Sequence, residues 1–206
     1  TGLLGNNIIR LLRQRMIKVR ALARKPGRHR SLDGLDVELA VGDVTDPASL
    51  TAAMDGCTGV IHAAGCVLLG WKNETLHRSI NHHGTRNVMQ AARTADARVV
   101  HVSTINATGV GTPFRPADEQ WSAAPNIACP YVVSKRAGEA AVREQIAKGL
   151  DAVIVRPGLM FGPWDWKPSS GRMILEVGCH FVPLAPTGGI SVCDVRDVAH
   201  GILTAF

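Results

Sequence analysis

The chain has 206 residues, of which 46% are hydrophobic and 19% are charged, and its formal net charge is +6. This length and composition are typical of one globular domain and exclude a disordered or fibrous chain. The five cysteines are scattered without a Cys-x-x-Cys pair, which argues against disulfides or a metal site and favours a reducing, cytoplasmic environment. No apolar stretch nears the roughly 20 residues that cross a bilayer, and no export leader opens the chain, so we expect no membrane partner.

Basic residues gather at the start of the chain. Residues 1–30 hold nine lysines and arginines and no acidic residue, whereas the remainder holds 14 basic and 17 acidic residues. The resulting positive potential would attract an anionic ligand, although a solvated helix face is the alternative for part of it. Residues 1–30 contain no aromatic side chain on which bases could stack, so we expect no nucleic-acid partner.

Hydrophobic periodicity predicts strands and helices that alternate along the chain. The predicted strands lie at 17–23, 37–41, 60–64, 98–103 and 152–156. The predicted helices run from about Ile8, over 47–54 with Asp46 as N-cap, over 73–94, over 131–148 and from Asp194, with loops at 106–125 and 157–171. Because the strands are apolar runs, this order predicts an α/β, Rossmann-type doubly wound parallel sheet with helices on both faces. Such sheets bind ligands at the carboxyl ends of their strands, so the segments there are the candidate sites.

A glycine turn opens the chain directly before the first predicted helix. Gly2 and Gly5 flank Leu3 and Leu4 in this turn. Glycines at a helix N-terminus let backbone N–H groups approach a pyrophosphate, and a simple tight turn is the alternative. The position of the turn before an amphipathic helix of a βαβ pattern favours the phosphate site.

Arg24 ends the second predicted element, where the cofactor preference of such folds is set. An acidic residue at that point would bind the ribose 2′-hydroxyl of NAD, whereas an arginine suits the 2′-phosphate of NADP. No acidic residue precedes Asp33, so the sequence favours NADP, with NAD still possible and an ordinary surface arginine as the alternative.

Two further predicted strands end in polar or small residues. Asp43 follows one of them and is open to interpretation as a cap of the next turn. Ala63, Ala64 and Gly65 lie at the end of the other, where small residues allow either a flat ligand or a closely packed helix to approach the backbone. We expect His62, just before them, to be a packed or hydrogen-bonded histidine and not a ligand.

The chain has a single tyrosine, Tyr131, and a lysine follows it four residues later at Lys135. On a helix these two positions share a face. A lysine ammonium there would lower the phenol pKa from its usual value of about 10 and make Tyr131 a usable proton donor. Thr104 places a hydroxyl group at the tip of another predicted strand.

Seven segments, taken in order, resemble the extended short-chain dehydrogenase/reductase superfamily. They read TGLLGNNI, VRALARKP, GDVTDPASL, VIHAAG, HVSTINATG, YVVSK and VRPGLMFGP. The chain looks closest to the dihydroflavonol-reductase-like and hydroxysteroid-dehydrogenase-like branch of the NAD(P)-dependent epimerases and dehydratases. The resemblance implies an NAD(P)-binding Rossmann domain over residues 1–206. The family's first strand and its C-terminal substrate region have no counterpart here, so we expect a fragment of a longer protein.

The resemblance also implies a role for each matching residue. Gly2 and Gly5 match the last two glycines of the family's Gly-x-x-Gly-x-x-Gly loop. Thr104 matches the catalytic Ser/Thr, Tyr131 the acid/base and Lys135 its partner. The other matches are expected to contact the cofactor: Asp43 and Val44 at the adenine, Ala63, Ala64 and Gly65 under the riboses, and Pro157 and Gly158 at the nicotinamide.

Two segments depart from family patterns. His82 stands where the family's Asn-Val-x-Gly-Thr segment has valine, which leaves the role of Asn81 open. In nucleotide-sugar 4,6-dehydratases, Asp and Glu follow the threonine and act as acid and base in removing water. The corresponding residues here are Ile105 and Asn106, neither of which exchanges protons at neutral pH. The sequence therefore predicts hydride transfer without elimination of water.

These observations predict an NADP-dependent oxidoreductase that acts on a carbonyl or alcohol group of a small, largely apolar substrate. An NAD-retaining nucleotide-sugar epimerase is the alternative enzyme, against which Arg24 argues mildly. A non-catalytic NADP-sensing regulator is the alternative from another class, and the presence of both Tyr131 and Lys135 argues against it. The substrate and a possible homodimer are left open, as are pocket or packing roles for Trp71, Trp164 and Trp166.

Overall fold

The computed structural model describes residues 2–68, 70–112, 114–120, 129–168, 170–180 and 189–206. Every strand pair named here is parallel, which confirms the predicted parallel α/β fold. Hydrogen bonds group the strands as β1 (Arg20–Ala23) with β2 (Glu38–Val41), β3 (Gly59–His62) with β4 (Arg98–Val102) and β5 (Ala152–Val155), and β6 (Leu159–Phe161) with β7 (Val192–Asp194). In the part of the chain that the structure describes, no strand is hydrogen-bonded between β1 and β3.

Seven α-helices with one π-helical and two 3₁₀ segments connect these strands in the described residues. They are α1 (Leu3–Gln14), α2 (Pro47–Met54), α3 (Glu74–His77), α4 (Thr85–Thr94), α5 (Pro130–Ile146), α6 (Ser170–Cys179) and α7 (Val195–Ala205), the π-helical η2 (Arg78–Gly84), and the 3₁₀ turns η1 (Arg30–Leu32) and η3 (Ile105–Ala107). The predicted helix over 73–94 is thus observed as α3, η2 and α4 in succession. None of the helices described is long and apolar enough to cross a membrane.

The prediction of a loop over 157–171 is wrong in part, because β6 lies within it. Gly158 and Gly162 flank this three-residue strand, and glycine-rich surroundings predict a turn from sequence alone. The strand forms because β7, far along the chain, pairs with it from Leu159 to Phe161. Of the predicted loop over 106–125, residues 113 and 121–125 lie outside the described residues, and η3 begins at its edge.

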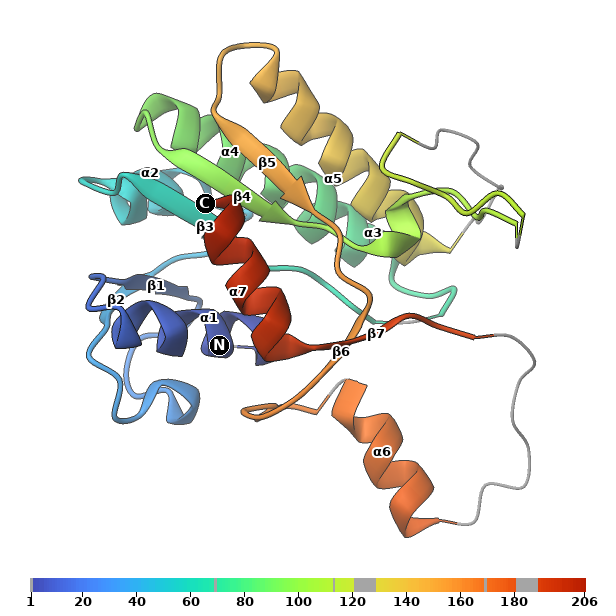
Figure 1. The fold of residues 1–206 in the computed structure, drawn as a ribbon. Helices are drawn as coiled ribbons and strands as arrows, with labels where there is room; N and C mark the ends of the chain where they lie inside the picture. Colours follow the sequence, from blue (N-terminus) through green and yellow to red (C-terminus); the bar gives the residue numbers. More distant parts are fainter. Residues whose placement is uncertain (1, 69, 113, 121–128, 169, 181–188) are drawn as a thin grey trace.

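Helices cover both faces of the β3-β4-β5 sheet (Figure 1). Alternate residues of a strand point to opposite faces, and β4 shows this directly. Val99 packs in one cluster of buried residues, with Leu50 of α2, Met89 of α4 and Val142 of α5. The opposite face of β4 packs in a second cluster, which includes Val100 and Val102 with Leu4, Ile8, Val195 and Ile202 from α1 and α7.

Two aspartates begin helices by accepting hydrogen bonds from backbone N–H groups. Asp46 accepts from the N of Ala48 at 3.1 Å and precedes Pro47, as the sequence predicts. Asp194 accepts from the N of Arg196 at 2.8 Å and begins α7. These caps fix the entry points of both helices.

Candidate active site

Three polar side chains converge where β4 ends and α5 begins. Thr104 follows β4, Tyr131 is the second residue of α5, and Lys135 lies one turn further along that helix. The Thr104 hydroxyl lies near enough to the Tyr131 hydroxyl to lower the pKa of the phenol. The Nζ of Lys135 donates to the carbonyl oxygen of Val102 at 2.8 Å. The structure therefore brings together the three residues that the sequence marks as catalytic candidates.

Burial dominates the electrostatics of this group. It lowers the pKa of Lys135 to about 8, and the nearby Glu139 carboxylate opposes this change. It also raises the pKa of Tyr131 above its ordinary value, and the nearby Thr104 hydroxyl offsets part of the rise. The expected lowering of the phenol pKa by Lys135 is therefore wrong for this structure, because desolvation of the phenolate outweighs the favourable interactions.

Asn81 connects the segment after β3 to α5. Its Oδ1 accepts from the N of Cys66 at 2.8 Å, while its Nδ2 donates to the carbonyl oxygen of Cys66 at 2.9 Å. The same Nδ2 donates to Ser134 Oγ at 3.0 Å, one residue before Lys135. Asn81 thus holds the segment after Gly65 against the helix that carries the candidate acid. The sequence left this role open because only the fold brings Cys66 and Ser134 to the same amide.

Two buried histidines lie near Lys135. His62 and His101 are register partners on β3 and β4, and their ring centroids are 5.1 Å apart. His62 Nε2 bonds with Thr85 Oγ1 at 3.1 Å, which confirms the expectation of a packed, hydrogen-bonded histidine. Burial lowers the pKa of His62 to about 3 and that of His101 well below its ordinary value. Both rings are therefore neutral near physiological pH.

Glu139 and Arg156 form a partly buried ion pair, which the sequence alone does not predict. Arg156 Nε donates to Glu139 Oε1 at 2.8 Å, and Arg156 Nη2 donates to Oε2 at 2.7 Å. Glu139 lies one helical turn after Lys135, and Arg156 lies one residue after β5. The i, i+4 spacing of Lys135 and Glu139 is visible in the sequence, but the arginine partner of Glu139 comes from the turn after β5.

The N-terminus of α1 presents backbone N–H groups next to open space. Gly2 is its exposed N-cap, no side chain caps the helix, and its first turn carries no acidic residue. A Cβ added at Gly2 or Gly5 would meet nothing within 4 Å, whereas Leu3 and Leu4 pack into the core. Backbone donors at the positive end of a helix dipole fit a pyrophosphate, so the turn suits the predicted cofactor.

Arg24 stands directly after β1 and is exposed. Among the described residues it makes no hydrogen bond or ion pair, although its charge acts on the carboxylate of Asp43. Asp43 Oδ1 accepts from the N and the Oγ1 of Thr45 at 2.9 and 2.8 Å, and these hydrogen bonds hold its pKa below the ordinary value. Asp43 therefore caps a turn, the alternative that the sequence left open, and Arg24 keeps its donors for another partner.

The remaining adenine and ribose candidates differ in exposure. Val44 is buried in the core, and its carbonyl oxygen accepts from Asn87 Nδ2 at 3.0 Å. Ala63 is half-buried, and Ala64 and Gly65 are exposed just beyond β3. The segment after β3 thus offers a small-residue surface, whereas the side chain of Val44 serves packing.

Pro157 and Gly158 join β5 to β6. The carbonyl oxygen of Pro157 accepts from the N of Ile105 at 3.0 Å, which ties this turn to the residue after Thr104. A Cβ at Gly158 would stand 2.5 Å from the carbonyl oxygen of Ser191, so the chain entering β7 packs directly on this glycine. Close packing therefore requires glycine at position 158, in addition to the contact with nicotinamide that the sequence predicts.

Two of the three candidate tryptophans pack against arginines. The Arg10 guanidinium lies 3.5 Å from the ring centroid of Trp164, and that of Arg30 lies 5.0 Å from the ring centroid of Trp166. Trp71 is 74% exposed. The structure thus favours local packing over a pocket wall for Trp164 and Trp166.

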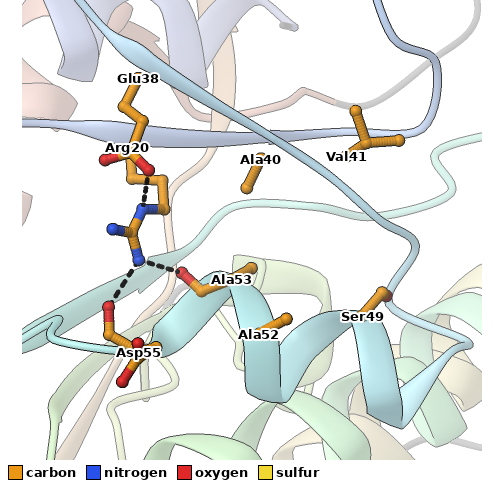
Figure 2. A pocket seen from close by; sticks show the side chains of 8 residues that line it. All are labelled: Arg20, Glu38, Ala40, Val41, Ser49, Ala52, Ala53 and Asp55. Atoms are coloured by element: carbon orange, nitrogen blue, oxygen red, sulfur yellow. Dashed lines mark hydrogen bonds and ion pairs between the residues drawn. The ribbon is translucent and has the colours of Figure 1, made fainter.

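A cavity of about 270 Å³ lies between the β1-β2 sheet and α2, and the catalytic candidates do not line it. Figure 2 shows Arg20 reaching from β1 toward α2, where its Nη1 donates to the carbonyl oxygens of Ala53 and Asp55 at 3.0 and 2.6 Å. Its Nε bonds with Glu38 Oε1 at 2.7 Å. The guanidinium of Arg20 and the carboxylate of Glu38 are bonded to the protein itself, so we interpret this cavity as a packing gap.

The model of the NAD-dependent epimerase/dehydratase family matches residues 1–206. The chain belongs to this family. A protein of Synechocystis sp. named as a dihydroflavonol 4-reductase is 37% identical over 100% of the chain and 61% of its own length. Sterol demethylase protein B of Methylococcus capsulatus is 36% identical over 96% of the chain and 61% of its own length. The chain thus spans about three fifths of the length of these curated relatives.

A solved structure has a similar fold. The crystal structure of gox2253 has a TM-score of 0.89 and 33% sequence identity, and it matches 99% of this chain and 63% of its own. Residues 1–206 therefore have the Rossmann-like α/β arrangement of this NAD(P)-dependent family.

Proposed function

We propose that the protein is an NADP-dependent oxidoreductase that reduces a carbonyl group, or oxidises the corresponding alcohol, of a small and largely apolar substrate. The observation that carries this proposal is the convergence of Thr104, Tyr131 and Lys135 at the end of β4. A similar protein named as a reductase supports it, as does the NAD-dependent family to which the chain belongs. On this proposal, residues 1–206 are the cofactor-binding domain.

The proposed chemistry needs a proton and a hydrogen bond at the carbonyl oxygen. The hydroxyl of Tyr131 donates the proton to that oxygen, and the hydroxyl of Thr104 donates a hydrogen bond that orients it. A positioned proton donor of this kind contributes roughly 10²–10⁴-fold to the rate. Lys135 lies one turn after Tyr131 on the same helix face, next to this proton donor. The nicotinamide cofactor, when bound, supplies the hydride.

Residues at several strand ends would hold this cofactor. The backbone N–H groups of the turn from Gly2 to Gly5 suit its pyrophosphate. The small residues from Ala63 to Gly65 and the turn at Pro157 and Gly158 suit its riboses and its nicotinamide. Lys135 has three N–H donors, of which one is bonded to Val102, and a ribose hydroxyl is a suitable acceptor for another.

The preference for NADP rests on Arg24. A guanidinium with free donors at the end of β1 fits a 2′-phosphate by bidentate, charge-assisted hydrogen bonds. Asp43 does not compete for it through a direct ion pair, because Thr45 holds that carboxylate. NAD remains the alternative cofactor.

The apolar substrate class rests on Ile105. This half-buried residue follows Thr104 directly, so it places an apolar side chain beside the proposed carbonyl position. We also propose a cytoplasmic location, which the five free cysteines support, whereas the homodimer stays a prediction.

Turnover of NADPH by the purified full-length protein tests the proposal. Steady oxidation of NADPH with members of a panel of apolar ketones is the expected result. The family name also favours a nucleotide-sugar epimerase, which must retain its cofactor through each cycle. Nicotinamide absorbance that co-purifies with the protein, together with interconversion of nucleotide sugars, would favour the epimerase. Cofactor binding with neither activity would favour a sensor.

A further inference from the structure

Glu139 is a carboxylate inside the protein, 2% exposed, on the helix that carries Tyr131 and Lys135. A charge so far from water is costly unless it is paired and hydrogen-bonded. Its partners are Arg156, through two hydrogen bonds, and Arg143, whose Nη2 donates to Oε2 at 3.0 Å. The single carboxylate thus faces two guanidinium groups.

Lys135 is the third cation of this region. It is 6% exposed and lies four residues before Glu139, so both side chains project from the same face of α5. The other titratable side chains around Lys135 are Tyr131 on the same helix, His62 on β3 and His101 on β4. None of these three carries a negative charge near neutral pH, because both rings are neutral and the phenol pKa is raised.

Arg156 extends the effect of Glu139 to the cofactor side of the proposed site. It directly precedes Pro157 and Gly158, and Pro157 is bonded to Ile105 beside Thr104. The ion pair therefore joins α5 to the turn after β5. Glu139 also raises the pKa of Lys135 and so favours its charged form. The carboxylate of Glu139 thus affects both the position of the turn after β5 relative to α5 and the charge of Lys135.

We propose that Glu139 is a positioning residue whose carboxylate keeps Lys135 charged and fastens the turn at Pro157 and Gly158 to α5. This inference rests on the proposed function only for its effect on turnover. Without this carboxylate, Arg156 and Arg143 lose their shared partner, and Lys135 loses the negative charge that favours its protonated form. Burial alone then acts on Lys135, whose pKa falls further below its ordinary value.

The test measures Lys135 directly. Full-length protein labelled with carbon-13 at the lysine ε-carbon is titrated by NMR, and Lys135→Met identifies the signal. In Glu139→Gln the pKa of Lys135 should fall by about one unit. In Arg156→Met it should not fall, because that change breaks the same ion pair but keeps the carboxylate, which Arg143 still pairs. Glu144→Gln, which removes an exposed ion pair with Lys148 on the same helix, is the matched control and should leave Lys135 unchanged.

Turnover gives the second measurement. In Glu139→Gln the alkaline limb of the pH profile of kcat should move to lower pH by the same amount as the lysine titration, so that low pH restores part of the activity. Equal lysine titrations in Glu139→Gln and the parent would overturn the inference, as would an equal fall in Arg156→Met. If the unsubstituted protein shows no turnover, the proposed function is wrong. The lysine titration still tests the role of Glu139 in that case. Should Glu139→Gln not fold, the doubly substituted Glu139→Gln/Arg156→Met, which removes both buried charges, must show the same fall.

Discussion

Gly138 of α5 lies against the backbone of Asn81 in η2. A Cβ added at Gly138 would stand 2.4 Å from the carbonyl oxygen of Asn81, a distance that no side chain tolerates. The contact lets α5 approach the π-helical segment whose asparagine holds Cys66 and Ser134. The placement of Tyr131 and Lys135 therefore depends on a missing side chain three residues after Lys135.

Replacing this glycine should separate the two elements. We expect Gly138→Ala to destabilise the protein by about 1–3 kcal/mol, because the methyl group meets backbone that cannot move aside as a flexible side chain does. Urea unfolding of the full-length protein measures this. Gly201→Ala in α7 is the control, since its Cβ meets nothing within 4 Å, and alanine there should stabilise by about 0.5–1 kcal/mol. Equal stabilities for the two variants would contradict the contact.

Tyr131→Phe removes the proposed proton donor and keeps the ring. We expect kcat to fall by roughly 10²–10⁴-fold, with the affinity for NADP little changed, because positioned proton transfer supplies a factor of this size. Steady-state kinetics and cofactor titration in the full-length protein measure the two effects. Near-normal turnover would show that Tyr131 is not the acid.

Arg24→Asp should reverse the charge at the proposed 2′-phosphate position. Hydrogen bonds to charged groups are worth about 1.5–3 kcal/mol, so we expect NADPH binding to weaken by roughly 10–100-fold while NADH binding changes little. Arg15→Asp gives the same change of charge at an exposed residue after α1 and serves as the control. Tighter binding of NADH than of NADPH by the parent would refute the assignment of NADP.

The two buried histidines predict a loss of stability in acid. Their pKa values are lower in the folded protein than in the unfolded chain, where histidine titrates near 6.5. The unfolded chain therefore binds more protons below this pH, and stability falls as the pH drops from about 6.5 toward the folded pKa of about 3 for His62. Each histidine contributes a slope of about 1.4 kcal/mol per pH unit.

Unfolding in urea at a series of pH values checks this slope. We expect His101→Leu to flatten the dependence by one histidine's share, because both ring nitrogens of His101 lack a hydrogen-bond partner among the described residues and leucine needs none. His200→Gln alters an exposed histidine and should leave the dependence unchanged. A parent protein whose stability does not vary between pH 7 and 5 would exclude the prediction.

The full-length protein should not dehydrate nucleotide-hexoses. Ile105 has no acidic proton, and the exposed Asn106 carries an amide that neither gives nor takes a proton near neutral pH. The backbone N of Asn106 donates weakly to Thr104 Oγ1 at 3.3 Å, so this residue contributes backbone to the site and no acid or base. Chromatography for a 4-keto-6-deoxy product is the measurement, and its formation at enzymatic rates would refute the predicted chemistry.

Local features of the sequence determined much of this fold. Apolar runs predicted β4 and β5, Asp46 and Asp194 marked helix starts, and the spacing of Tyr131 and Lys135 placed both on one face of α5. Such signals act between residues a few positions apart, so they can be detected from the sequence alone. The sequence likewise predicts that His62 is packed or hydrogen-bonded and not a ligand.

Only the tertiary structure decided the contacts between distant residues. β6 exists because β7 pairs with it. The carboxylate of Glu139 on α5 pairs with Arg156 from the turn after β5, and Asn81 contacts Cys66 and Ser134 from two other segments. The pKa of Tyr131 rises where the sequence predicted a fall, because periodicity gives the neighbours on a helix but not the depth of burial. Desolvation depends on everything packed around a group, and that quantity exists only once the chain has folded.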